Sequence, residues 1–511
     1  MDRRTFVKLM TVGGVAAVAA ACRPSEAQTT PALQSTAGDA VTPTVTDVPF
    51  APPVNRSREA HVINRLTFGP TPGLVNAVNQ MGAEAYIEAQ LAPGSIPDTA
   101  IEELLAPFDF LNADVDDLVE AYDRSELVST FIWTTLLRAV YSRRQLYEIL
   151  VHFWSDHFSI FIADPTLSYH KPVDDREVIR AHALGSFREM LGASARSSAM
   201  LLYLDNAFSF KTRPNENYAR ELLELHTLGV DGAYTEQDVK EIARCFTGWT
   251  LNRVYNTRGR RAGSRFVFEP EMHDDGSKIV LGEVIPAGGG MADGEMVLDI
   301  VANHPDTARY ISQKLIRRFV ADAPPGGLVE QCAQVFQETG GAIRPMLRTI
   351  FSSEKFWNAP PKYRRPFEYV VAMLRLLNYT VPPQSISVPW LSRALQAMGH
   401  TPFMHPSPDG YPDTMDEWIG NQLARWNVAV AALDEDSIGF GEGINNALKE
   451  NDIPQEPEAV MTFFANIALG RPMTAEESDL LLGYISDTGS GQTALLEGLA
   501  LLISSPGFQY R

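Results

Sequence analysis

Apolar residues recur at helical spacing along most of the chain after residue 55. The stretch 127–158 contains no Gly or Pro, so it predicts one or two long helices. Helix starts are marked by Thr71-Pro72, an N-cap followed by proline, and by the capping-box sequences 235–238 and 474–477. We therefore predict a mainly α fold, with a single large helical domain over residues 56–511.

Two regions interrupt this pattern. Residues 252–290 are rich in Gly and Arg and contain the short runs 266–268 and 278–281, which have strand character. Residues 382–412 are rich in proline, which limits helix to short pieces there. We expect a small, irregular, β-hairpin-like insertion at about residues 252–290.

The first 22 residues have the pattern of an export signal. Arg3-Arg4 followed by Phe6 and Lys8 has the form of a twin-arginine signal. The apolar run 10–21 has 12 residues, too few to span a bilayer, and it is rich in Gly and Ala. The sequence therefore predicts a protein that is exported from the cytoplasm.

Cys22 follows three alanines, which is typical of a lipoprotein processing site; an ordinary cleavage site with a chance cysteine is the alternative. Residues 23–55 are rich in Pro and Thr and predict a disordered tether. We expect either a lipoprotein on the outer face of the cytoplasmic membrane or a secreted or periplasmic protein.

The net charge of −20 over 511 residues becomes about −22 once the signal is removed. Such a charge argues against nucleic-acid binding and against anionic-lipid binding by the body of the protein, so only an N-terminal lipid would attach it to a membrane. No other run of 18 apolar residues exists. Without Cys22, only Cys245 and Cys332 remain, which allows one disulfide.

The densest polar cluster lies in the predicted helix that follows Pro214, and its members are Asn215, Glu216, Asn217, Arg220, Glu221 and Glu224. Glu216, Arg220 and Glu224 share one helix face by their four-residue spacing. Glu221 lies about 100° further round, beside the apolar stripe. A solvated face with ordinary ion pairs is one interpretation; a functional site is the other, because two carboxamides flank the first carboxylate at the helix start.

Two further clusters contain histidine. His152 and Asp156 are four residues apart, as in a carboxylate-oriented imidazole or a ligand pair, and His157 lies about 140° from His152 on a straight helix. His273 and Asp274 precede a Gly turn within the insertion and could coordinate a metal. Half-buried, hydrogen-bonded histidines and a plain polar turn are the respective alternatives.

Familiar catalytic motifs are missing from the sequence. It contains no phosphate-binding G-x-x-x-x-G-K-[ST] loop, no H-E-x-x-H, no G-x-S-x-G and no G-x-G-x-x-G after a strand. Neither Cys245 nor Cys332 lies in a C-x-x-C sequence. Any active site must therefore be argued from the clusters above.

The motifs together resemble one bacterial family, the domain of unknown function number eighteen hundred. The resemblance runs in order over almost all of the mature chain, through residues 61–69, 153–158, 183–190, 203–206, 215–225, 234–239, 246–249, 273–278, 304–309 and 408–412. It implies a mainly helical fold and a secreted or envelope location. It also implies a possible partner, a co-exported protein that resembles phosphatases and sulfatases. It supplies no catalytic residues.

Three interpretations remain open. The first is an exported enzyme, a hydrolase that depends on a divalent metal, with Glu216, Arg220, Glu221, Glu224 and His157 as its catalytic residues. Its metal ligands would be His157, Glu221, His273 and Asp274. The second is a non-catalytic partner or assembly factor for the phosphatase- or sulfatase-like protein. The third is a purely structural polar network.

Overall fold

The computed structural model describes residues 56–511 except 257–258, 382–388, 434–439 and 489–490. The predicted signal, lipid-attachment cysteine and tether lie outside the described residues. The predicted mainly α fold is confirmed: helices account for most of the described chain, with two small antiparallel hairpins. No described helix is both long enough and apolar enough to cross a membrane.

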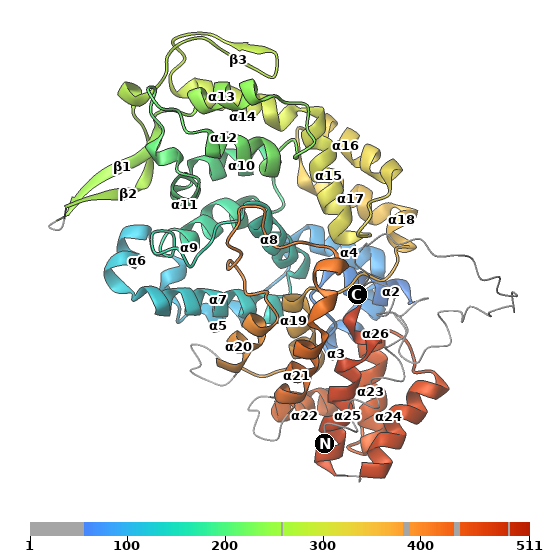
Figure 1. Cartoon of the computed structure of the whole chain (residues 1–511). Coiled ribbons are helices and arrows are strands. Elements are labelled where there is room, and N and C mark those ends of the chain that lie inside the picture. The colour runs from blue at the N-terminus through green and yellow to red at the C-terminus, as the bar shows by residue number, and fades with distance from the viewer. Residues whose placement is uncertain (1–55, 257–258, 382–388, 434–439, 489–490) are drawn as a thin grey trace, which may run out of the picture.

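The first seven described helices form the middle of the molecule (Figure 1). They are α2 (Arg58–Leu66), α3 (Pro72–Met81), α4 (Ala83–Leu91), α5 (Thr99–Leu105), α6 (Val115–Ala121), α7 (Arg124–Tyr141) and α8 (Gln145–His157). The Gly- and Pro-free stretch therefore forms two helices, as predicted. Thr71 caps α3 by accepting a hydrogen bond from the Leu74 amide.

The next part of the chain, green to yellow in Figure 1, lies above these helices in that view. Its elements are α9 (Lys171–Asp174), the π-helix η4 (Asp175–Arg180), α10 (Phe187–Arg196), α11 (Ser198–Tyr203), α12 (Glu216–Glu221), the π-helix η6 (Leu222–His226), α13 (Glu236–Cys245), α14 (Met291–Asn303), α15 (Pro305–Phe319), α16 (Gly326–Thr339), α17 (Ile343–Ser352) and α18 (Glu354–Trp357). The predicted capping box of Thr235 and Asp238 begins α13.

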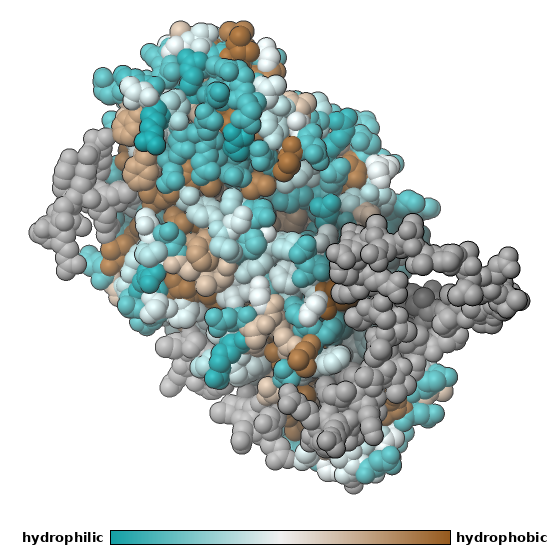
Figure 2. All heavy atoms as spheres, in the orientation of Figure 1, coloured by the Kyte–Doolittle hydropathy of each residue, from teal (hydrophilic) through white to brown (hydrophobic). Residues whose placement is uncertain are grey.

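The insertion predicted at about 252–290 is present as two hairpins. Strand β1 (Trp249–Asn256) pairs with β2 (Gly259–Phe268), and β3 (Lys278–Val280) pairs with β4 (Glu283–Ile285). The β1–β2 hairpin projects from the body in Figure 1. Ile279 and Val284 are exposed and face each other across the second hairpin, and apolar atoms gather at that edge in Figure 2.

The C-terminal helices, orange to red, complete the body (Figure 1). They are α19 (Pro366–Leu376), α20 (Pro389–Ala397), α21 (Gln422–Ala432), α22 (Phe440–Glu450), α23 (Pro457–Leu469), α24 (Ala475–Thr488), α25 (Gln492–Ser504) and α26 (Pro506–Gln509). Every residue of α19 is buried, and this helix contacts α7, α20 and α23. The main apolar core extends from Val62 to Phe508. Cys245 and Cys332 are buried free thiols, so the disulfide that the sequence allows does not form.

Candidate functional site

The residues predicted for the site lie in three separate places. Glu216 and Arg220 lie on the outer side of α12, His273 and Asp274 lie beside the second hairpin, and His157 and Glu221 belong to a third cluster described below. Among the described residues, no group of three or more His, Cys, Asp or Glu side chains is arranged so that it could hold a metal ion. The four proposed metal ligands are therefore not gathered into one coordination sphere.

Arg220 pairs mainly with a carboxylate from another helix. Its guanidinium donates to both carboxylate oxygens of Glu236 at 2.7 and 2.8 Å, while Glu216 and Glu224 lie at 3.8 and 3.7 Å. The side chains of Arg220 and Glu236 are 33% and 68% exposed. The predicted row Glu216–Arg220–Glu224 is therefore a partly solvated ion-pair face that fastens α12 to α13.

His273 and Asp274 are fully engaged by protein groups. The His273 ring has Nδ1 2.8 Å from the Thr247 carbonyl oxygen and Nε2 3.2 Å from Asp293 Oδ2. The Arg244 guanidinium donates to Asp274 at 2.8 Å, and this hydrogen bond lowers the pKa of the carboxyl. Asp274 thus joins the turn before β3 to Arg244 of α13, and His273 joins the same turn to Thr247 and to Asp293 of α14.

His157 lies at the C-terminal end of α8 with both ring nitrogens occupied. Nε2 lies 3.1 Å from the carbonyl oxygen of His226, which can only accept, so Nε2 carries the proton. Nδ1 is then an acceptor, and the Lys314 amine donates to it at 2.9 Å. The buried imidazole is therefore a fixed, neutral acceptor, and burial together with Lys314 holds its pKa well below the ordinary value.

Lys314, on α15, is only partly exposed. Burial lowers the pKa of its amine to about 8, and Arg317 acts in the same direction. Asp156, Asp409 and Asp413 oppose this decrease. The pKa of the amine therefore lies close to neutral pH, in the range that suits a general acid, a general base or a nucleophilic lysine.

Tyr203 and Glu221, which are partly exposed, and the exposed Asp409 complete this site. We call it the Lys314 cluster, and its members are His157, Tyr203, Glu221, Lys314 and Asp409. Burial raises the pKa of Glu221, and Glu224 adds to the increase. Burial and the charges of Asp409 and Glu221 raise the pKa of Tyr203 to about 12. The pKa of Asp409 is lowered, so the carboxyl groups of Glu221 and Asp409 have pKa values displaced in opposite directions, which is typical of catalytic pairs.

Asp409 is the ionised carboxylate of that pair. Burial opposes its ionisation, but hydrogen bonds from Ser407 and His405 outweigh burial and lower the pKa. His405 Nε2 lies 2.9 Å from Asp409 Oδ1. The Tyr203 hydroxyl donates to the Pro406 carbonyl at 2.9 Å, so the same loop is fastened to the end of α11.

Backbone geometry holds the elements of the cluster together. Gly410 has a φ of +72°, and a Cβ there would lie 2.0 Å from the Asp156 carbonyl oxygen, so only glycine lets the loop approach α8 this closely. Gly229, after η6, has a φ of +88°, and a Cβ there would lie 2.9 Å from the Tyr310 ring. The wider π-helical turn η6 places Glu221 at its start and His226 at its end.

A network of buried ion pairs joins the elements that carry the Lys314 cluster. Arg365 donates to Asp156 at 2.7 Å and to Glu368 at 3.1 Å, and Glu368 also pairs with Arg318. At the end of the loop, Lys362 lies 3.3 Å from Asp413. These pairs join α8, α15 and α19 to the loop that carries Asp409.

A family model described as a protein of unknown function (DUF1800) matches residues 61–510, most of the chain. The chain belongs to this family. No curated protein and no solved structure matches the chain. The motifs containing His157, Tyr203, Glu221 and Asp409 are distant in sequence, yet in the fold His157 accepts a hydrogen bond from Lys314, and the charge of Asp409 acts on Tyr203, Glu221 and Lys314.

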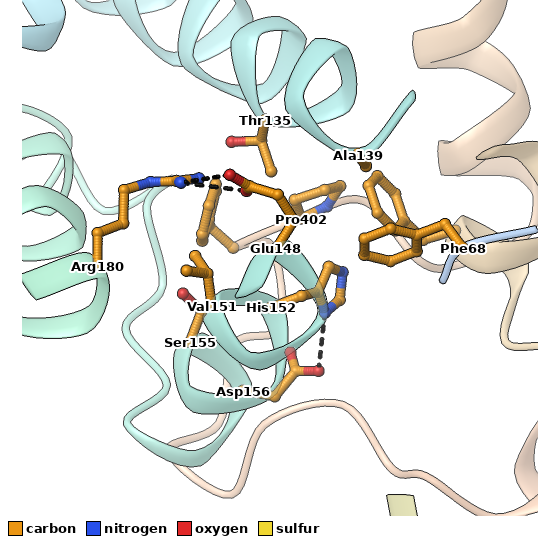
Figure 3. A pocket seen from close by; sticks show the side chains of 12 residues that line it. Phe68, Thr135, Ala139, Glu148, Val151, His152, Ser155, Asp156, Arg180 and Pro402 are labelled. Carbon is orange, nitrogen blue, oxygen red and sulfur yellow. Dashed lines mark hydrogen bonds and ion pairs between the residues drawn. The ribbon is translucent and has the colours of Figure 1, made fainter. Parts of the chain in front are cut away.

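A small cavity beside α8, lined by apolar side chains together with Glu148, His152, Asp156 and Arg180, is the second candidate site (Figure 3). It offers about 20 Å³ to the centre of a water molecule, which is room for about one water. Arg180 donates to both oxygens of Glu148 at 3.1 Å, and His152 lies 3.4 Å from Asp156. The cavity beside α8 is too small for a substrate, so the Lys314 cluster is the better candidate for an active site.

Sequence reasoning missed three members of the Lys314 cluster. Tyr203 and Asp409 lie in motifs of the DUF1800 resemblance, so those motifs were the signal that could have pointed to them. Lys314 gave no signal, because a lysine near the end of an amphipathic helix is ordinary. Its role depends on burial and on His157, 157 positions earlier in the chain.

Proposed function

We propose that this DUF1800 protein is an exported cell-envelope hydrolase that works by acid–base catalysis in the Lys314 cluster. Glu221 acts as the general base that takes a proton from water. The Lys314 ammonium acts as the general acid that protonates the leaving group, and His157 positions it. The observation that carries the proposal is the 2.9 Å hydrogen bond from Lys314 to a neutral imidazole in a partly exposed site.

The protonation states favour these roles. Between the raised pKa of Glu221 and the Lys314 pKa of about 8, the carboxylate is ionised and the amine is protonated. In that pH range both groups hold the form that each role needs. Tyr203 and Asp409 flank them and supply a hydroxyl and a fixed negative charge.

Activity of matched variants tests the proposal. Purified protein is assayed with chromogenic esters, amides, glycosides and phosphate esters. Where the wild type is active, Glu221→Gln and Lys314→Met are expected to lose about a hundredfold or more of kcat/KM. The exposed controls Glu338→Gln and Lys240→Met retain it. Equal activity of all variants would contradict the proposal. A wild type that is inactive on every substrate would favour the alternative, a non-catalytic partner of a phosphatase- or sulfatase-like protein.

Export and anchoring are parts of the proposal that the N-terminal sequence supports. Changing Arg3 and Arg4 together to Lys is expected to leave the precursor in the cytoplasm, because the arginine pair is the address that the export receptor reads. Cys22→Ser is expected to release the exported protein to the soluble fraction. Cell fractionation checks both; normal export of the double variant would contradict the twin-arginine route, and a mature N-terminus other than Cys22 would contradict the lipid anchor.

A further inference from the structure

Lys314 differs from the buried lysines in its partner. Lys171 lies 2.7 Å from a carboxylate oxygen of Asp174, Lys278 pairs with Asp293, and Lys362 pairs with Asp322. Each of these amines lies against a carboxylate oxygen. Within the described part of the chain, Lys314 has no carboxylate oxygen within 4.0 Å, and its hydrogen-bond partner is the neutral Nδ1 of His157.

This geometry leaves the lone pair of the neutral amine available. Neutral Lys314 donates one N–H to His157, while its lone pair can point away from the imidazole. The Tyr310 ring lies beside the amine, with its centroid 5.4 Å from Nζ. A partly desolvated amine with a free lone pair is the arrangement that lets lysine attack carbonyl carbon.

The groups that face Lys314 come from every element packed against it. His157 and Asp156 lie on α8, His226 on η6, Tyr310 and Arg317 on α15, and Asp409 and Asp413 on the loop. His226 contributes a second buried neutral imidazole, whose pKa burial lowers to about 3. The two nearest rings are therefore uncharged at neutral pH and do not repel an incoming polar carbonyl group.

We propose that Lys314 is a covalent site for aldehydes and ketones, 2-oxo acids included, which it holds as imines. The amine nitrogen bonds to the carbonyl carbon and gives up two protons. The carbonyl oxygen leaves with them as water. Hydrolysis reverses the step, so no oxidant or reductant takes part. The inference shares with the proposed function only the Lys314 amine and its hydrogen bond to His157.

Reductive trapping tests this inference on the full exported protein. The protein is incubated with glyoxylate, or with propanal, and sodium cyanoborohydride at about pH 7.5, and its peptides are analysed by mass spectrometry. At that pH about a quarter of Lys314 amines are neutral, against about a thousandth of ordinary lysines. We expect the reduced adduct to form on Lys314 at least about tenfold faster than on exposed Lys240 and Lys355.

Two variants serve as controls in the trapping experiment. Lys314→Met is expected to abolish the fast adduct and leave the slow surface reaction unchanged. His157→Phe keeps an aromatic ring but removes the acceptor, and it is expected to slow trapping at Lys314 severalfold while circular dichroism shows a folded protein. Trapping at Lys314 no faster than at Lys240 would overturn the inference. If Lys314 still acylates at neutral pH in that case, the proposed acid–base function stands without it.

Discussion

Lys314 and Arg220 show how the neighbours of a charged side chain decide its role. In the sequence Lys314 was an ordinary helical cation, whereas Arg220 belonged to the densest polar cluster. In the structure Arg220 donates to the carboxylate of Glu236 at the surface, whereas Lys314 donates to the imidazole of His157 in a half-buried site. A hydrogen bond to Glu236 raises the pKa of Arg220, while burial lowers that of Lys314.

The pH profile of activity follows from the two proposed catalytic groups. For any substrate that the wild type turns over, kcat/KM should be bell-shaped. The alkaline limb should lie at about 8, where Lys314 loses its proton, and the acid limb above 4.5, the ordinary value for glutamate, where Glu221 gains one. Lys314→Arg is expected to move the alkaline limb upward or abolish activity. If the Lys314→Arg variant is active and its alkaline limb is unchanged, the alkaline limb belongs to the titration of another group.

Stability should respond to Lys314 in the opposite direction from activity. Its folded pKa, about 8, is below its unfolded value of 10.5, so the unfolded chain binds more protons between these values. This group therefore destabilises the fold below about pH 8, and the effect disappears as the pH rises toward 10.5. Lys314→Met is expected to melt at or above the wild-type temperature at pH 7 while inactive. A clearly lower melting temperature would make Lys314 a structural residue.

Arg220→Leu tests the interpretation of the α12 face. Because the Arg220–Glu236 pair is partly solvated, its loss is expected to cost under about 1 kcal/mol of unfolding free energy. Urea denaturation measures the difference. A cost of several kcal/mol would mean that the face is buried in solution and that the ion pair is a core contact.

At the scale of elements, the cluster depends on close backbone approaches. Gly410 places the loop against the end of α8, and η6 inserts a π-helical turn between Glu221 and His226. The sequence predicted the start of α12 correctly, since Asn215 accepts from the Asn217 amide. It did not predict the π turn, because helical spacing does not reveal a one-residue widening that tertiary packing stabilises.

Gly410→Ala tests the role of the loop. The new methyl would collide with the Asp156 carbonyl, so the loop must shift and carry Asp409 away; we expect a loss of activity and a destabilisation on the order of 2 kcal/mol. Gly399→Ala is the matched control, since Gly399 has a φ of +73° but no atom within 4 Å of a Cβ. If both variants behave alike, backbone strain explains the effect and the contact with Asp156 does not.

At the scale of the whole molecule, charge is buried at the junction of distant segments. Capping boxes, helix starts and the β-containing insertion could be predicted because their signals are local. The ion pairs that position the site could not be predicted from the sequence, because partners such as Asp156 and Arg365 are 209 residues apart. For the same reason, the sequence could propose His157 and Glu221 for a site but grouped them with His273 and Asp274, which the fold places elsewhere.

The buried network predicts a specific sensitivity to acid. Burial opposes ionisation of Glu368, but Arg318, Arg511 and Arg365 outweigh it and hold its pKa well below the ordinary 4.5. The stabilisation is therefore complete above about pH 4.5 and is lost as the pH falls toward the folded pKa. Glu368→Gln is expected to cost on the order of 3–5 kcal/mol at pH 7, because it leaves buried arginines unpaired.

The exposed pair Glu88–Arg348 is the control for that prediction, with both side chains 55% exposed. Glu88→Gln should cost under about 1 kcal/mol by the same denaturation measurement. Equal costs at the two positions would show that the network around Glu368 is solvated and does not fasten α19 to α15.

The titration of Lys314 tests the central claim most directly. Competitive acetylation with acetic anhydride between about pH 6 and 11, with each lysine followed by peptide mass spectrometry, measures the fraction of neutral amine at every position. The account predicts a midpoint of about 8 for Lys314, well below the midpoints of exposed Lys240 and Lys355. A Lys314 midpoint equal to theirs would contradict the account, because the amine would then be an ordinary ammonium with no part in acid–base chemistry.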